Sequence, residues 1–139
     1  MPSIGLPFAN KIEMHNMVNS SVASVVLGDI CVLLASEDGD EVGTTTTGGD
    51  NATLRGGGVM AVETITSGSR GRFQRLGYTQ SLKVDGTADI AIGDRLTTFT
   101  TAGIAKKAAV GDPYFSTALE AYATNDSLGV IDAVLTEPG

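Results

Sequence analysis

The sequence contains few of the residues that usually carry out enzyme chemistry. Its 139 residues include one His, one Cys and no Trp, and only 5% are aromatic. A zinc site needs several His or Cys ligands, and a nucleophilic site needs a base beside its nucleophile, for which His15 is the sole imidazole. The single cysteine, Cys31, has no partner for an internal disulfide. The composition therefore predicts a protein that is not an enzyme and holds no metal or cofactor.

Basic residues and long hydrophobic runs are also scarce. The chain has 9 basic and 16 acidic residues, a net charge of −7, and its longest apolar run, residues 30–35, has only the length of a strand. Nucleic-acid phosphates and anionic lipid headgroups repel such an acidic surface. The first residues lack the basic region and continuous apolar segment of a signal peptide. We therefore expect no nucleic-acid or membrane partner, and synthesis in the cytoplasm.

Short apolar segments separated by turn residues make up most of the chain. They predict strands over residues 12–18, 30–35, 59–65, 78–84, 88–92, 95–100, 104–110 and 128–135. The corners at Leu27-Gly28-Asp29 and Ile92-Gly93-Asp94 repeat one turn signal, and good helix formers over 116–123 predict one short helix. This pattern predicts a mainly β fold, a compact antiparallel β-barrel or sandwich with one short helix and an extended N-terminal arm.

The predicted organisation is a single β-rich domain over residues 11–139, preceded by an arm over residues 1–10. The arm has no hydrophobic period but carries apolar side chains, which favour docking onto another surface: Ile4, Leu6, Pro7 and Phe8. Residues 37–50 are acidic and rich in Thr and Gly, so we expect an exposed loop there. The acidic residues of this loop do not follow the spacing of a calcium-binding EF-hand.

Three of the five arginines fall within seven residues, at Arg70, Arg72 and Arg75. On an acidic protein, a local basic cluster indicates a specific contact with acidic groups of a subunit or another partner. The alternative is that these side chains lie over the protein's own β surface. Both interpretations remain open at the level of sequence.

The C-terminal part of the chain, residues 79–135, resembles the head decoration (cement) proteins of tailed bacteriophages. The resemblance rests on residues 81–86 (SLKVDG), 90–96 (IAIGDRL), 101–107 (TAGIAKK), 118–121 (ALEA) and 129–135 (GVIDAVL). It implies a β-rich homotrimer on the outer surface of the virion head, where it binds the major capsid protein and stabilises the shell by bridging neighbouring capsomers. The N-terminal half resembles the family only in composition.

Two other functions compete with this interpretation. The protein could be a receptor- or carbohydrate-binding module of a phage tail or fibre, although sugar sites favour exposed aromatic residues and Trp is absent. It could also be a small enzyme that uses an N-terminal Pro2 or a carboxylate, although Gly5 and Pro7 interrupt the strand that such an enzyme needs. The capsid-binding interpretation fits the shortage of chemical groups better than either alternative.

Overall fold

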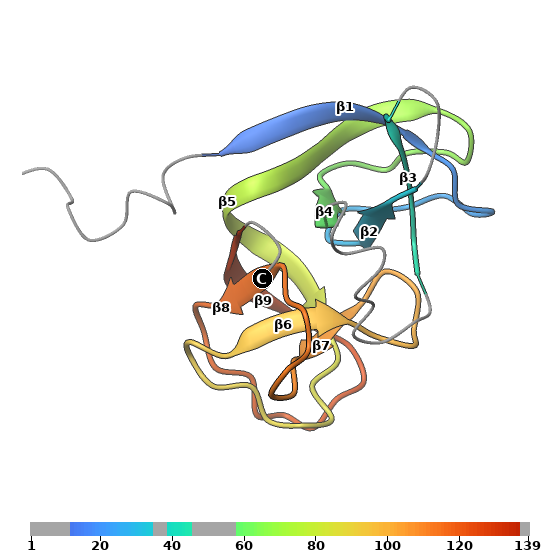
Figure 1. Ribbon diagram of the computed structural model, residues 1–139. Coiled ribbons are helices and arrows are strands. Elements are labelled where there is room, and N and C mark those ends of the chain that lie inside the picture. Colours follow the sequence, from blue (N-terminus) through green and yellow to red (C-terminus); the bar gives the residue numbers. More distant parts are fainter. Residues whose placement is uncertain (1–11, 35–38, 46–57, 137–139) are drawn as a thin grey trace, which may run out of the picture.

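A computed structural model describes residues 12–34, 39–45 and 58–136 of the chain (Figure 1). Within these ranges the secondary structure consists of nine strands and includes no helix. The strands are β1 (Glu13–Asn19), β2 (Ile30–Leu33), β3 (Glu41–Gly43), β4 (Gly58–Ala61), β5 (Arg70–Val84), β6 (Arg95–Thr98), β7 (Ala105–Lys107), β8 (Ser116–Ala118) and β9 (Gly129–Leu135). The described residues therefore hold no helix that is long and apolar enough to span a bilayer.

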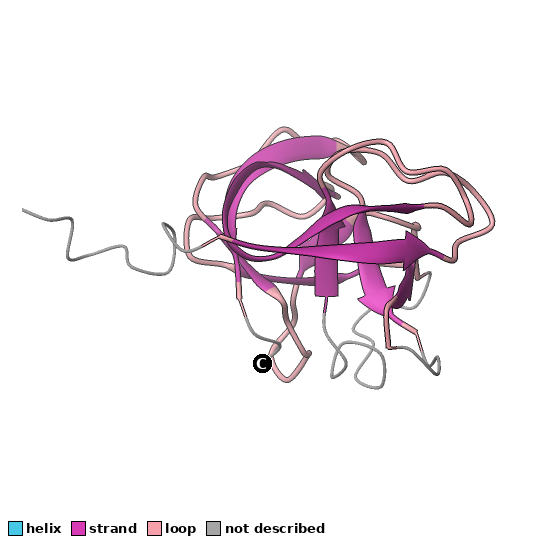
Figure 2. Cartoon of the chain, turned by 90° about the horizontal axis from the view of Figure 1, so that it is seen from above, coloured by secondary structure: helices cyan, strands magenta, loops and turns pink. Residues whose placement is uncertain are grey.

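The strands form one mixed sheet whose pairings close two rings that share β5. In the first ring the order is β1, β3, β2, β4 and β5, and β5 pairs back to β1. In the second ring the order is β5, β7, β6, β8 and β9, and β9 pairs back to β5. The β1–β3 and β5–β7 pairings are parallel and the others are antiparallel. The prediction of a mainly β fold is confirmed, and Figure 2 shows strands and loops throughout the described chain.

The long strand β5 joins the two rings because it bends near its middle. Its pairing with β1 shifts register at Arg75, which has no opposite residue on β1. Gly77 follows with φ of 101°, a conformation that favours glycine. The amide of Gln74 holds this bend by donating to the carbonyl oxygens of Leu76 and Tyr78 at 3.1 and 3.0 Å. The strand expected over residues 78–84 is therefore the second part of a longer strand that begins at Arg70.

The buried apolar side chains form two clusters that meet at β2. Ile30 and Val32 pack into the larger cluster, together with side chains of the second ring. Cys31 points to the opposite side and packs into the smaller cluster around Phe73. Both faces of β2 are thus covered, which explains why this strand reads as a continuous apolar run. Cys31 is fully buried, with an exposed fraction of 0%.

The Gly-Asp corner expected twice in the sequence occurs three times in the structure. Gly28, Gly93 and Gly111 have φ of 92° to 93°, and each is followed by an aspartate whose carboxylate accepts a backbone N–H three residues back. These bonds join Asp29 to Val26, Asp94 to Ala91 and Asp112 to Ala109, at 2.8, 2.8 and 3.0 Å. A related turn at Gly68 has Ser69 in place of the aspartate, so the described part of the chain uses one turn design at four corners.

The prediction of a helix over residues 116–123 is wrong. Residues Ser116–Ala118 form β8, which is held between β6 and β9 and buries Ser116 and Ala118. Tyr122 then forms an isolated bridge with Ile90, which is the only strand-like pairing within the strand expected over 88–92. Strand pairing on both sides satisfies more backbone groups here than a short isolated helix would, so tertiary contacts override the local helix propensity.

The prediction of a loop over residues 37–50 is wrong for three of these residues. Glu41–Gly43 form β3, and Val42 is fully buried between β1 and β2. The neighbouring residues 37–38 and 46–50 lie outside the described part of the chain. A single apolar residue among acids was too weak a pattern to indicate a strand, because β3 is set by partners distant in the sequence.

Candidate interaction surfaces

The residues expected to contact a capsid or subunit fall into two groups, of which the structure describes one. The four arm residues lie within the undescribed residues 1–11: Ile4, Leu6, Pro7 and Phe8. The three arginines lie on the first half of β5. Over residues 12–34, 39–45 and 58–136, no group of three or more His, Cys, Asp or Glu side chains gathers in a way that could hold a metal ion.

Arg70 and Arg72 lie on the outer side of the β1–β5 pair, and each contacts a carboxylate of the same chain. Arg70 donates to Asp40, and the Nε of Arg72 lies 3.6 Å from Glu63. Both arginine side chains remain more than half exposed, and surface ion pairs of this kind contribute about 0–1 kcal/mol and are screened by salt. These arginines could exchange their partners for acidic groups of another protein. Their contact with a partner remains a prediction.

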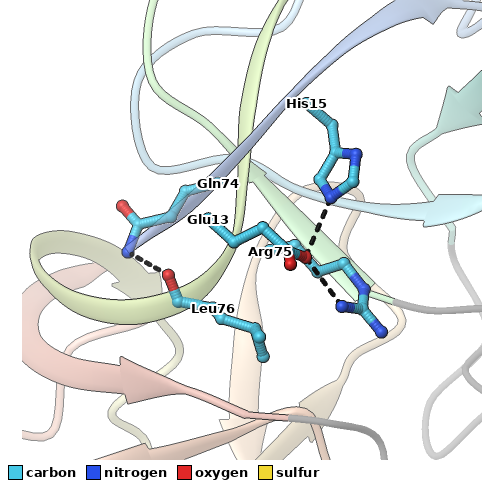
Figure 3. A network of polar contacts seen from close by, with 5 residues as sticks. All are labelled: Glu13, His15, Gln74, Arg75 and Leu76. Atoms are coloured by element: carbon cyan, nitrogen blue, oxygen red, sulfur yellow. Dashed lines mark hydrogen bonds and ion pairs between the residues drawn. The ribbon is translucent and has the colours of Figure 1, made fainter. Parts of the chain in front are cut away.

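Arg75 takes part in a small polar network at the bend of β5 (Figure 3). Its Nη1 donates to Oε2 of Glu13 at 2.7 Å, and Nε2 of His15 lies 2.9 Å from the same oxygen. These contacts with His15 and Arg75 lower the pKa of Glu13 below its ordinary value. The network ties the start of β1 to the bulge in β5. His15 is exposed on β1 and takes part in the network through Glu13.

β1 presents apolar side chains to solvent although it is part of the sheet. Met14 is 45% exposed, and Ile12, directly before β1, is 52% exposed. Sequence reasoning predicted a strand here but not its exposure, since the position of a strand within a sheet depends on its distant partners. The alternation of Met14 and Asn16 with Glu13 and His15 is the local signal that β1 presents two different faces.

A second exposed apolar area surrounds an ion pair between the two rings. Lys83 donates to Asp29 at 2.8 Å, and both side chains are mostly buried. The backbone N–H of Lys83 donates to the carbonyl of Gly28, which follows the half-exposed Leu27. On its other side Lys83 is paired with the exposed Val130 of β9. No sequence pattern indicates this pair, because its members are 54 residues apart.

A groove of about 340 Å³ lies between two of the Gly-Asp turns. Its lining comes from residues 93–95 and 108–112 and from Tyr114. The guanidinium carbon of Arg95 lies 4.3 Å from the centre of the Tyr114 ring, and Lys107 lies 3.3 Å from Asp94. The groove combines an aromatic face with charged groups that contact one another, so it offers both shape and polarity to a partner.

Comparison with known proteins identifies a similar fold but no family. No protein-family model matches the sequence, and a search of curated proteins finds no match. A solved structure described as the N base of the head fiber protein gp8.5 of bacteriophage phi29 superimposes with a TM-score of 0.57. The match covers 91% of this chain and 96% of that chain, at 17% sequence identity. At this identity the likeness concerns the fold alone.

Proposed function

We propose that this protein is a structural component of a bacteriophage virion that binds the outer surface of the head. The observation that carries the proposal is the fold shared with the base of the phi29 head fiber, over nearly the whole of both chains. Residues 79–135 independently resemble phage decoration proteins. In this role the protein is not an enzyme, because binding to a shell needs complementary surfaces and no reacting group.

The finer form of the proposal is that of a cement protein. The protein binds the major capsid protein, bridges neighbouring capsomers and associates as a homotrimer. The arm residues Ile4, Leu6 and Phe8 serve as apolar anchors, and the exposed Arg70 and Arg72 contact acidic groups. Many weak contacts of this kind, repeated on a symmetric lattice, give tight attachment through avidity.

A second candidate is suggested by the description of the similar structure. The protein could form the base of a fibre on the head, where it positions a projecting structure and adds little to the strength of the shell. Both candidates place the protein on the head. They differ in whether its removal weakens the capsid.

The experiment is to remove the protein from the phage that encodes it and to add it back. Heads with and without the purified protein are imaged by cryo-electron microscopy, and their resistance to heat is measured by DNA release. Density that bridges capsomers, with loss of heat resistance in its absence, supports the cement role. Density that continues into a fibre, with unchanged resistance, supports the fibre base. Heads that never acquire the density contradict both.

Two variants test the named contacts against a matched control. A chain that lacks residues 1–10 should bind heads at least about tenfold more weakly, a loss of about 1.4 kcal/mol or more. Replacement of Arg70 and Arg72 with Gln should weaken binding less and should reduce its dependence on salt. Val22→Ser, at a fully exposed loop position, is the control and should bind like the unaltered chain. Binding that survives the truncation would contradict the role of the arm.

A further inference from the structure

Among the described residues, one edge of β1 has no pairing strand along most of its length. On one side it pairs with β5 from Glu13 to Val18, whereas on the other side β3 pairs only with Val18 and Asn19. No described residue pairs with the segment before Val18 on this second side. Figure 1 shows β1 lying along β5, with β3 reaching it only at one end. An edge of this kind offers backbone groups to another strand.

The backbone hydrogen bonds show which residues face the free edge. The N–H of Val18 donates to Asp40 on the β3 side, and the N–H of Asn19 donates to Ser69 on the β5 side. Since successive residues of a strand point their backbone groups in opposite directions, Met14 and Asn16 face the same side as Val18. The register shift lies in β5 and leaves β1 regular, so this alternation continues to Glu13.

The segment also lacks the features that usually protect an edge. It contains no Lys and no Pro between Ile12 and Met17, and β1 has no bulge of its own. Ile12 and Met14 add exposed apolar area on the same face of the strand. Pairing would therefore satisfy backbone groups and bury apolar surface at the same time.

We propose that the free edge of β1 pairs antiparallel with the same edge of a second copy, about a two-fold axis at Met14. Hydrogen bonds across the new pair require that a residue facing the edge in one copy lies opposite a residue facing the edge in the other copy. A register centred on Met14 meets this condition, and so does a register centred on His15. The register at Met14 places Glu13 opposite the second copy's His15, on one face of the new sheet. The register at His15 would instead place two histidines opposite each other, so the contact between Glu13 and His15 favours the register at Met14.

The existing contacts of Glu13 leave room for this pairing. His15 and Arg75 of its own chain both contact Oε2, and a carboxylate has a second oxygen that can accept a hydrogen bond. Both copies use the same surface, so the contact closes at two copies and does not propagate. The inference goes beyond the proposed function, since it concerns two copies in solution and needs no capsid. It can also join copies that belong to separate trimers.

Disulfide trapping tests the contact and its register. In a hydrogen-bonded antiparallel pair the Cα atoms lie about 5.5 Å apart, within the range of about 4.4–6.8 Å for disulfides. Met14→Cys should therefore form a covalent dimer under mild oxidation, at least about tenfold faster than a variant whose thiols meet only by collision. Val110→Cys, at an exposed turn of the second ring, is that control. The native Cys31 is buried and does not interfere.

Two further variants make each outcome decisive. His15→Cys should dimerise more slowly than Met14→Cys, and the reverse order would overturn the proposed register. Met14→Pro removes an N–H that points to the free edge, so the contact between copies should be lost while β1 still pairs with β5. Unchanged circular dichroism with a loss of concentration-dependent mass in sedimentation supports the proposal. Met14→Cys dimerisation no faster than that of Val110→Cys overturns it.

Discussion

At the scale of single residues, the repeated turns separate two costs of replacing a glycine: backbone strain at positive φ, and a clash between the added Cβ and neighbouring atoms. Gly28 and Gly93 have nearly the same φ, 93° and 92°. A Cβ at Gly28 would lie 2.2 Å from the carbonyl oxygen of Ser81, whereas a Cβ at Gly93 would meet nothing within 4 Å. Gly93→Ala should therefore cost only backbone strain, about 1–2 kcal/mol. Gly28→Ala should cost about 1–3 kcal/mol more, because the chain must also move away from a steric clash.

Urea denaturation of both variants measures this difference directly. The unaltered chain serves as the reference, and Gly39→Ala is a further control, since its φ is also positive and its surroundings are open. Equal losses of stability in Gly28→Ala and Gly93→Ala would show that the close approach of Gly28 to β5 does not exist in solution.

Cys31 provides a second prediction at this scale. Burial, together with the nearby charge of Asp29, raises the pKa of its thiol to about 12. An unfolded cysteine ionises near pH 8.5, so the unfolded state loses this proton first. The contribution of the thiol to stability is therefore complete below about pH 8.5 and declines as the pH rises toward the folded pKa. The free energy of unfolding should fall more steeply between pH 8 and 10 in the native chain than in Cys31→Ala. Identical slopes would contradict the raised pKa.

At the scale of elements, the same turn appears with and without a buried ion pair. Asp29 caps its turn and also accepts from Lys83, whereas Asp112 caps an equivalent turn on the surface. Asp29→Asn keeps an oxygen that can cap the turn but leaves the mostly buried Lys83 without its counter-charge. It should destabilise the protein by about 1–3 kcal/mol, whereas Asp112→Asn should change stability by less than about 0.5 kcal/mol. Thermal unfolding measures the loss of stability in both variants. Equal losses in Asp29→Asn and Asp112→Asn would contradict the role of the ion pair.

The elements also show which parts of the fold could be predicted from the sequence. Local patterns identified β1, β2, β9 and the Gly-Asp turns, because alternation and turn chemistry act over a few residues. The prediction of a helix over 116–123 failed because β8 pairs with β6 and β9, and because Tyr122 lies against Gly86, a glycine far away in the sequence. A Cβ at Gly86 would lie 2.3 Å from the Tyr122 ring. No local sequence pattern indicates these contacts.

The candidate surfaces likewise combine features that the sequence indicates with features that depend on strand pairing. The arginine cluster was visible in the sequence, but its partners Asp40 and Glu63 were not, because strand pairing brings them together. The free edge of β1 was invisible for the same reason. Whether a strand lies at an edge depends on which other strands pair with it, and the residues of the strand itself do not indicate those partners.

At the scale of the whole molecule, the two rings share too much structure to be independent. β5 belongs to both, and Ile30, Val32 and Met60 of the first ring pack with Leu82 and other side chains of the second. The sequence predicted a single domain over residues 11–139, and this shared core gives a physical reason to expect one cooperative unfolding transition. Cys31 reports on the first ring through its accessibility to a thiol reagent. Tyr114 and Tyr122 report on the second through fluorescence.

The two probes should therefore change at the same urea concentration. Leu82→Ala, in the half of β5 that belongs to the second ring, should lower stability by about 2–5 kcal/mol because it leaves a cavity in the shared core. In a cooperative protein it shifts the Cys31 and tyrosine transitions equally, although Cys31 lies in the other cluster. A tyrosine transition that moves alone, with Cys31 still protected, would mean that the first ring persists without the second and that the chain contains two folding units.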